Sequence, residues 1–214
     1  MKAERLAFTT AHQHWSPHMR KKVMFSDESN FKTIRATARQ TVRRPSGTRF
    51  DPRFTRKTVK HPAGVMVWGC FSGLKGRGGL FFLPKGTTMN SDWYVECLDN
   101  HLLPFMRIHG CKRFLQDGAS CHKSKKTLAH LAAQPFSIID WPGNSPDLNP
   151  IENVWNWMKD QLQNINITSV PMLQEEIKKL WVQRTPIAYL RKLCDSMPSR
   201  LQQVIDADGN MTKY

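Results

Sequence analysis

The order of strand and helix patterns along the chain is the feature that most constrains its fold. Residues 23–31 alternate between apolar and polar side chains, as a half-buried strand does, and residues 64–71 form the nearly continuous apolar run of a strand covered on both faces. A glycine-rich turn over residues 73–79 leads to a third strand pattern at residues 80–83, which predicts a hairpin. Alternating patterns then follow: a helix from residue 91, a strand at 113–117, a helix at 124–134, a strand at 136–141 and a helix at 150–163. Three leading strands followed by alternating elements predict an α/β fold with a mixed five-stranded sheet flanked by helices.

This order is that of the ribonuclease H-like fold, although other α/β folds share much of it. We assign the core to residues 21–163 and expect residues 164–214 to form two or three helices that pack on it. Residues 1–20 predict a short helix before the Ser16-Pro17 break. The apolar side predicted for this first helix consists of Ala3, Leu6, Ala7 and Ala11.

The composition is strongly basic. Thirty-two Lys and Arg against 17 Asp and Glu give a formal net charge of +15. Such an excess attracts polyanions, which favours nucleic acid as the partner, although a basic protein without a specific partner would have the same composition. No stretch approaches the roughly 18 consecutive apolar residues of a membrane span, and the N-terminus lacks the apolar run of a signal peptide. Five cysteines without a CxxC pair fit reduced thiols better than a disulfide framework or a zinc site.

Basic residues concentrate between the first two strands, in residues 35–63, where the apolar pattern is sparse. We interpret this segment as an extended insert with a short strand near Thr41 and Val42. Its Lys and Arg side chains are suited to contact DNA phosphates, and a solvated loop is the alternative. The candidate DNA-binding residues are Arg43, Arg44, Arg49, Arg53, Arg56, Lys57 and Lys60.

Three acidic residues are candidates for a shared metal site. Asp27 lies in the interior of the first strand pattern, on the face of its large apolar residues, whereas Glu28 falls on the opposite face. Asp117 ends a later strand, and Glu152 lies in the first turn of a helix. If the two strands are parallel neighbours, the three carboxylates can meet. Carboxylate oxygens suit Mg²⁺, and a pair of such ions activates a nucleophile and stabilises the leaving oxygen in phosphoryl transfer.

Each acid also has a structural interpretation. Asp27 could bond a backbone amide and leave the function to Glu28, and Asp117 before Gly118 could mark a turn. Glu152 fits a capping box, with Asn149 as N-cap and Pro150 at the first helical position, which would stabilise the helix by about 1 kcal/mol without any metal.

Four sequence blocks change this balance: VMFSDES at 23–29, VWGCF at 67–71, FLQDGASCH at 114–122 and WPGNSPDLNPIENVW at 141–155. They closely resemble the four hallmark blocks of the mariner superfamily of transposases, in the branch that includes Sleeping Beauty. That branch has the same gap of 34 residues between its second Asp and its Glu as separates Asp117 from Glu152 here. The resemblance extends over residues 3–214.

The resemblance implies a ribonuclease H-like catalytic domain in which Asp27, Asp117 and Glu152 bind two Mg²⁺ ions, with Mn²⁺ as a substitute. It implies a nuclear enzyme that cuts double-stranded DNA at transposon ends and joins each freed 3′-OH to target DNA at TA sites. Family members act as homodimers, and a clamp-like insert at the position of residues 35–63 reaches the partner. His122 matches the family's block and is a possible active-site neighbour in contact with DNA or a metal-bound phosphate, with an ordinary exposed histidine as the alternative.

Two residues depart from the family pattern, because Gly118 stands where an Asn is frequent and Ser120 where a Pro is frequent. They flank the expected metal site and leave open a domesticated or decayed derivative that binds DNA without catalysis. A ribonuclease H or another nuclease on the same fold is a third reading, which the 34-residue gap disfavours. Family members also carry two helical DNA-binding modules ahead of the catalytic domain. Nothing here resembles them, so residues 1–20 correspond to the residual linker, and we do not expect specific recognition of transposon ends.

Overall fold

A computed structural model describes residues 1–33, 43–48, 51–54, 62–163 and 165–214, and its centre is a five-stranded sheet. The strands are β1 (Val23–Lys32), β2 (Gly64–Ser72), β3 (Gly76–Phe82), β4 (Arg113–Leu115) and β5 (Ser137–Ile138). Their order is β3-β2-β1-β4-β5. The β1–β2 and β2–β3 pairs are antiparallel, and the β1–β4 and β4–β5 pairs are parallel. The predicted mixed five-stranded sheet is confirmed.

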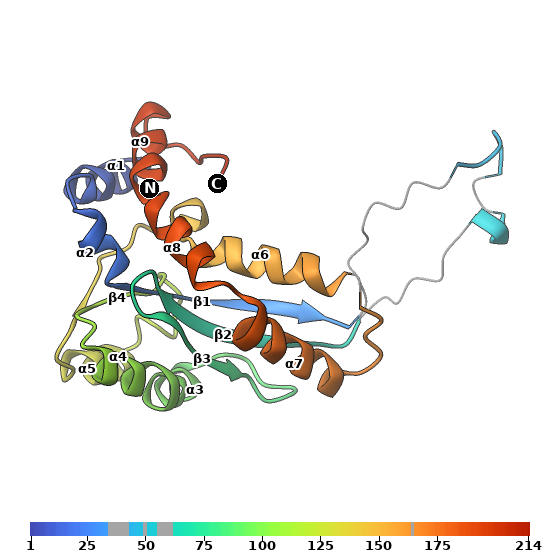
Figure 1. Cartoon of the computed structure of the whole chain (residues 1–214), viewed down its shortest axis with the longest axis horizontal. Helices are drawn as coiled ribbons and strands as arrows, with labels where there is room; N and C mark the ends of the chain where they lie inside the picture. The colour runs from blue at the N-terminus through green and yellow to red at the C-terminus, as the bar shows by residue number, and fades with distance from the viewer. Residues whose placement is uncertain (34–42, 49–50, 55–61, 164) are drawn as a thin grey trace.

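One face of the sheet is covered by a layer of short helices, shown in green and yellow in Figure 1. This layer contains α3 (Ser91–Cys97), the π-helix η2 (Leu98–Leu102), α4 (Leu103–His109) and α5 (Lys125–Ala132). Asn90 begins α3 by accepting hydrogen bonds from the amides of Asp92 and Trp93, and Ser124 caps α5. The core on this side includes fully buried Met24, Trp68 and Phe114.

The other face of the sheet is covered by the C-terminal helices (Figure 1). They are α6 (Ile151–Leu162), α7 (Val170–Lys179), the π-helix η4 (Leu180–Arg184) and α8 (Ile187–Asp195). At one end of the domain, α1 (Lys2–His12) contacts α9 (Met197–Asp206), and α2 (Pro17–Lys21) contacts α8. This core is built around Phe25 together with Trp155 and Trp181, whose rings stack with centroids 5.4 Å apart.

The alternation along β1 separates the two cores and so places the acids. Val23, Phe25 and Phe31 belong to the α6 side, and Met24 belongs to the opposite side. Asp27 therefore shares the α6 face and Glu28 the other. Close packing of α6 on the sheet depends on Gly69, because a Cβ at that position would lie 2.7 Å from Cη2 of Trp155. A side chain at position 69 would push away the helix that carries Glu152.

Several predicted elements differ in length from those observed. The hairpin turn is shorter than predicted, and β3 already begins at Gly76, because Gly78 and Gly79 pack against Cys70 and His101 without room for a Cβ. The strands predicted over 113–117 and 136–141 end at Leu115 and Ile138.

The apolar side predicted for the first helix is wrong. The buried residues of α1 are Arg5, Phe8 and Thr9, whereas Ala3, Ala7 and Ala11 are exposed. Within the described part of the chain, no helix combines the length and apolar character needed to cross a membrane.

Candidate active site

The three predicted acids meet at one cavity. Asp27, Asp117 and Glu152 all line a cavity of about 450 Å³. Its other lining residues come from the loop after β4 and the loop before α6: Gly118, Ala119, Lys123, Trp141, Gly143, Asn144, Ser145, Pro146 and Asn149. As the sequence predicts, the three acids come from separate elements. Asp27 lies in the central strand β1, Asp117 in the loop after β4 and Glu152 in α6.

Strand register brings the first two acids together. The parallel β1–β4 ladder pairs Phe25 with Leu115, and β4 ends there while β1 continues. Continuing the same register by two residues places Asp27 beside Asp117. The Asp117 side chain is anchored locally, because its Oδ1 atom accepts a hydrogen bond of 2.9 Å from the amide of Ala119.

Glu152 is the second residue of α6, but the predicted capping box is absent. The side chain of Asn149 does not cap the helix, whose N-cap residue is Pro150 without a side-chain hydrogen bond. Instead Nδ2 of Asn149 donates to the backbone carbonyl of Ser26 in β1, at 3.1 Å. The side chain of Asn149 thus ties the start of α6 to the strand that carries Asp27, and Glu152 is left facing the cavity.

The local electrostatics disfavour negative charge on two of the acids. Burial, followed by the charges of Glu152 and Glu28, raises the pKa of Asp27 well above its ordinary value. Burial also raises the pKa of Glu152, although Lys159 and a hydrogen bond with Asp27 oppose this. Two neighbouring carboxyl groups in a partly desolvated cavity share protons more readily than they ionise together. A bound cation would favour the ionised form of both groups.

Asp117 differs because a histidine supports its charge. Nδ1 of His122 lies 2.7 Å from Oδ1 of Asp117, and Nε2 lies 3.2 Å from Oε1 of Glu28. The hydrogen bond with His122 lowers the pKa of Asp117. Burial alone would lower the pKa of His122, but its bonds to Asp117 and Glu28 raise it to about 10. The His122 ring packs against the Tyr94 ring at a tilt of 33°, with centroids 4.0 Å apart.

His122 is 2% exposed, so the alternative of an ordinary exposed histidine is wrong. Ligand atoms of Glu28, Asp117 and His122 lie within 4.8 Å of one another, a spacing that a metal ion could span. We interpret the group as a hydrogen-bonded triad, because both ring nitrogens already face carboxylates and a protonated imidazole cannot bind a metal. Glu28 was considered only as an alternative to Asp27, and its link to Asp117 through His122 was not predicted from the sequence, since Glu28 and Asp27 face different sides of the sheet.

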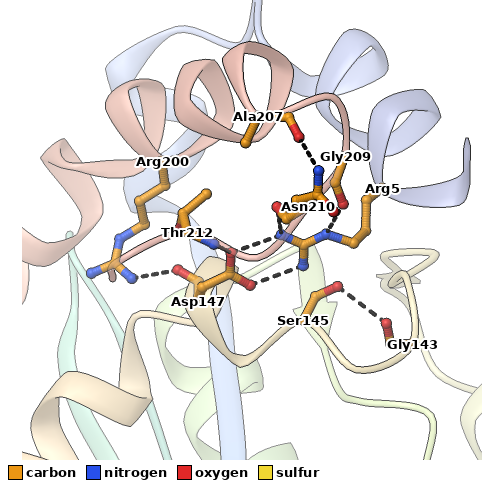
Figure 2. A network of polar contacts seen from close by, with 9 residues as sticks. All are labelled: Arg5, Gly143, Ser145, Asp147, Arg200, Ala207, Gly209, Asn210 and Thr212. Atoms are coloured by element: carbon orange, nitrogen blue, oxygen red, sulfur yellow. Dashed lines mark hydrogen bonds and ion pairs between the residues drawn. The ribbon is translucent and has the colours of Figure 1, made fainter. Parts of the chain in front are cut away.

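A buried polar network fixes the loop before Glu152, as Figure 2 shows. Asp147 lies in the 3-10 helix η3 (Pro146–Leu148) and accepts two hydrogen bonds from Arg5 of α1, at 2.9 and 2.7 Å. It also accepts bonds from the amide and hydroxyl of Thr212. Arg200 of α9 donates to the carbonyl of Asp147 at 2.7 Å and to Oδ1 of Asn153 at 2.6 Å. The N-terminal helix, the C-terminal tail and α9 therefore hold the active-site loop together.

The donor atoms in the cavity fit a divalent cation. The hydrogen bonds that Asp117 accepts within the described residues end on Oδ1, so Oδ2 is available. Oδ1 of Asn149 is buried without a hydrogen-bond partner among the described residues. Carboxylate and amide oxygens are the ligands of hard cations, and a bound cation would supply the charge that raised pKa values show to be missing.

The loop at Gly118 and Ser120, where the chain departs from the family pattern, is closed by hydrogen bonds. The amides of His122 and Lys123 both donate to the carbonyl of Ala119, at 3.0 and 3.2 Å. The φ angle of Gly118 is not positive, so its backbone does not itself require glycine. The departures therefore do not disrupt the placement of Asp117.

The candidate DNA-binding residues are only partly covered by the structure. Arg49, Arg56, Lys57 and Lys60, like the strand predicted near Thr41 and Val42, lie outside the described residues. Arg43 and Arg44 are described and exposed. Arg53 lies within the short 3-10 helix η1 (Pro52–Phe54). It forms an exposed ion pair of 2.7 Å with Asp51. Contacts of these residues with DNA stay predictions.

The fold and the acid cluster define the class of protein. A family model described as a DDE superfamily endonuclease matches residues 22–174, and the chain belongs to this family. It is 36% identical over 214 residues to the transposase of the element Tcb2 from Caenorhabditis briggsae, across 98% of this chain and 77% of the relative.

Solved structures show the same fold. The catalytic domain of Mos1 mariner transposase superposes with a TM-score of 0.78 at 14% identity, covering 99% of this chain and 95% of that one. A mariner Mos1 paired-end complex with Mg gives a TM-score of 0.84 at 16% identity, covering 99% of this chain and 63% of that one. The ribonuclease H-like fold is confirmed. The chain is a transposase catalytic domain, a metal-dependent DNA endonuclease and strand transferase.

Proposed function

We propose that Asp27, Asp117 and Glu152 hold two Mg²⁺ ions, and that the chain uses them for cut-and-paste transposition. The enzyme would cut phosphodiester bonds at transposon ends and transfer each 3′-OH into target DNA at TA sites. The observation that carries the proposal is the meeting of three carboxyl groups from β1, the loop after β4 and α6 at one cavity. Burial and mutual proximity raise the pKa of two of them.

The position of each acid supports a division of roles. Asp27 comes from β1, which pairs with β4 and contacts α6, so its carboxylate would hold the metal together with Asp117 and Glu152. When bound, two divalent ions activate a water or 3′-OH nucleophile and stabilise the leaving oxygen. Burial raises the pKa of Asp27 and of Glu152 in the metal-free protein, and a bound cation would favour the ionised form of both carboxyl groups. Asp117 is already ionised, held by His122 and the amide of Ala119.

Similar proteins support the choice of metal and partner. Mos1 transposase forms paired-end complexes with Mg and with Mn, which supports Mg²⁺ as the metal with Mn²⁺ as substitute. They also support double-stranded DNA as substrate and a homodimer that synapses two ends. The formal charge of +15 agrees with a DNA substrate. We place the enzyme in the nucleus, where that substrate is.

Strand transfer by the 214-residue chain tests the proposal directly. A pre-nicked duplex with a free 3′-OH is incubated with supercoiled target plasmid and Mg²⁺ or Mn²⁺, and joined products are sequenced. We expect joining at TA sites that Asp117→Ala abolishes. Asp160→Ala, which removes an exposed aspartate from the far end of α6, is the matched control and should retain activity.

The alternative function gives the opposite result in the same assay. A derivative that binds DNA without catalysis would retain the duplex but yield no joined product with either metal. Products confined to RNA–DNA hybrids would instead indicate a ribonuclease H. Either result would overturn the proposed function.

A further inference from the structure

Lys123 lies at the wall of the catalytic cavity and comes from the same loop as Asp117. The turn that follows Asp117 closes through the bond from the Lys123 amide to the Ala119 carbonyl, and this turn directs the Lys123 side chain back across Gly118. A Cβ built on Gly118 would lie 3.0 Å from Nζ of Lys123 and 3.2 Å from its Cε. Both distances are shorter than ordinary van der Waals contact, so a side chain at position 118 would displace the end of the lysine by a few tenths of an ångström.

The charge of Lys123 is unusual for this cavity. Among the described residues that line it, Lys123 is the only Lys or Arg, beside three acidic residues. Its side chain is exposed, and no carboxylate oxygen of the described chain lies within 4.0 Å of its ammonium group. Lys126, three residues further along, differs in this respect because it pairs with Asp92 on the surface. An ammonium group without a carboxylate partner at the mouth of a metal-binding cavity is suited to an anionic substrate group.

We propose that Lys123 binds a backbone phosphate of the DNA strand whose end reacts in the cavity, and that Gly118 keeps the space for it. This rests on the proposed function, since the phosphate is that of the DNA substrate. Lysine contacts phosphate as a point charge with three donors, so it fixes the strand without reading its sequence. The departure at position 118 from the family pattern and the lysine at 123 then form one functional unit.

Binding measurements test the contact independently of catalysis. The affinity of the 214-residue chain for a short duplex is measured in Ca²⁺ at several salt concentrations. Each phosphate contact contributes about 0.9 to the slope of log affinity against log salt. We expect Lys123→Met to lower the magnitude of this slope by about 1. Lys125→Met removes the same charge two residues away, outside the cavity lining, and serves as the control.

Strand transfer then tests the role of the contact in the reaction. We expect Lys123→Met to lower the rate about 10- to 100-fold, as the loss of a charge-assisted hydrogen bond does. Lys123→Arg should restore most of the rate, which a purely structural role of the lysine would not predict. Gly118→Ala should lower the rate severalfold in the wild-type background and cause no further loss together with Lys123→Met.

The outcomes separate this inference from the proposed function. The proposed function stands if the wild type joins DNA and Asp117→Ala does not. In that case, the role of Lys123 is wrong if Lys123→Met has the same rate and salt slope as Lys125→Met. If Lys123→Met leaves the salt slope unchanged but lowers the Mg²⁺ concentration required, Lys123 competes with metal, which also overturns the contact. If the wild type joins nothing, the proposed function fails, and the salt slope still decides whether Lys123 binds phosphate. Additive losses from Gly118→Ala and Lys123→Met would refute the role of Gly118.

Discussion

Nδ1 of His122 lies 2.7 Å from Oδ1 of Asp117, a contact that joins a candidate metal ligand to the opposite side of the sheet through Glu28. The second ring nitrogen reaches Glu28, so His122 is held between two carboxylates and cannot turn freely. Groups that orient a ligating carboxylate have a strong effect on metal binding. Asp117 is thus prepared for its role by a residue that does not itself face the cavity.

Replacing His122 should weaken metal binding while the fold remains. His122→Phe keeps a ring that can pack against Tyr94 and removes both polar contacts. We expect Mn²⁺ affinity, measured by titration calorimetry, to fall about 10- to 100-fold because Asp117 loses its orientation. His130→Phe, at a histidine 3.0 Å from Asp99 and outside the cavity, is the control. Equal affinities for wild type and His122→Phe would contradict the positioning role.

The same triad predicts a pH dependence of stability. The pKa of His122 is about 10 in the folded protein against 6.5 in the unfolded chain. The charged ring therefore stabilises the fold fully below pH 6.5, and this contribution is lost as the pH rises toward 10. Urea unfolding in EDTA should show the largest stability advantage of wild type over His122→Phe near pH 6, and a much smaller one near pH 10. If the stability advantage of the wild type over His122→Phe grew with pH, the charged ring of His122 would not stabilise the fold.

Removing the carboxylate of Asp27 should stabilise the metal-free protein. Burial and the charges of Glu152 and Glu28 raise the pKa of Asp27, so its ionised form is unfavourable in the fold. In EDTA at neutral pH we expect Asp27→Asn to increase the free energy of unfolding by roughly 0.5–2 kcal/mol, a range usual when a strained functional site is relieved. The gain should begin to decline as the pH falls through the raised pKa of folded Asp27, and it should vanish near pH 3.8, where the unfolded chain also becomes protonated.

Added Mg²⁺ should act in the opposite direction. It should stabilise the wild type but not Asp27→Asn, because only the wild type retains the Asp27 carboxylate as a candidate ligand. Asp160→Asn, on the exposed end of α6, is the control for both measurements. A metal-free Asp27→Asn protein that unfolds more easily than the wild type would contradict the raised pKa.

Breaking the buried pair between Arg5 and Asp147 should be costly. Both side chains are almost completely buried and meet at 2.7 Å, so Arg5→Met leaves an unpaired charge under the active-site loop. We expect a loss of about 3–5 kcal/mol in the free energy of unfolding, measured in urea. The exposed pair of Lys178 with Glu175 provides the comparison, since Lys178→Met should change stability by at most about 1 kcal/mol. Similar losses at the two sites would show that the network in Figure 2 does not hold the loop.

Overpacking at Gly69 should displace α6. Gly69→Ala places a Cβ 2.7 Å from Cη2 of Trp155 and 3.0 Å from Leu80. We expect a loss of about 1–3 kcal/mol in stability together with slower strand transfer, because α6 carries Glu152. Combining it with Trp155→Phe should cost less than the sum of the two single losses, since the smaller ring makes room. Gly143→Ala is the stability control, because a Cβ there meets no atom within 4 Å. If the stability losses of Gly69→Ala and Trp155→Phe were additive, the strain at Gly69→Ala would not come from contact with the Trp155 ring.

The sequence by itself determined the elements and the identity of the three acids. Alternation with a period of two placed Asp27 and Glu28 on opposite faces of β1, because successive side chains of a strand point in opposite directions. The blocks around Asp117 and Glu152, with their spacing, indicated the family that the comparisons confirm. Strand alternation and short sequence blocks are local properties, so they can be recognised within a short stretch of the chain.

Only the tertiary structure decided which polar groups are paired. Arg5 is buried where the sequence favoured alanines, because its guanidinium reaches an aspartate 142 positions away. Asn149 bonds β1 instead of capping α6, and His122 reaches Glu28 across 94 positions. A buried polar group must find a partner, and the partner is fixed by which segments pack together. Neither helical nor strand periodicity carries that information, so the three candidate metal ligands could be proposed from the sequence, while the residues that hold them in place could not.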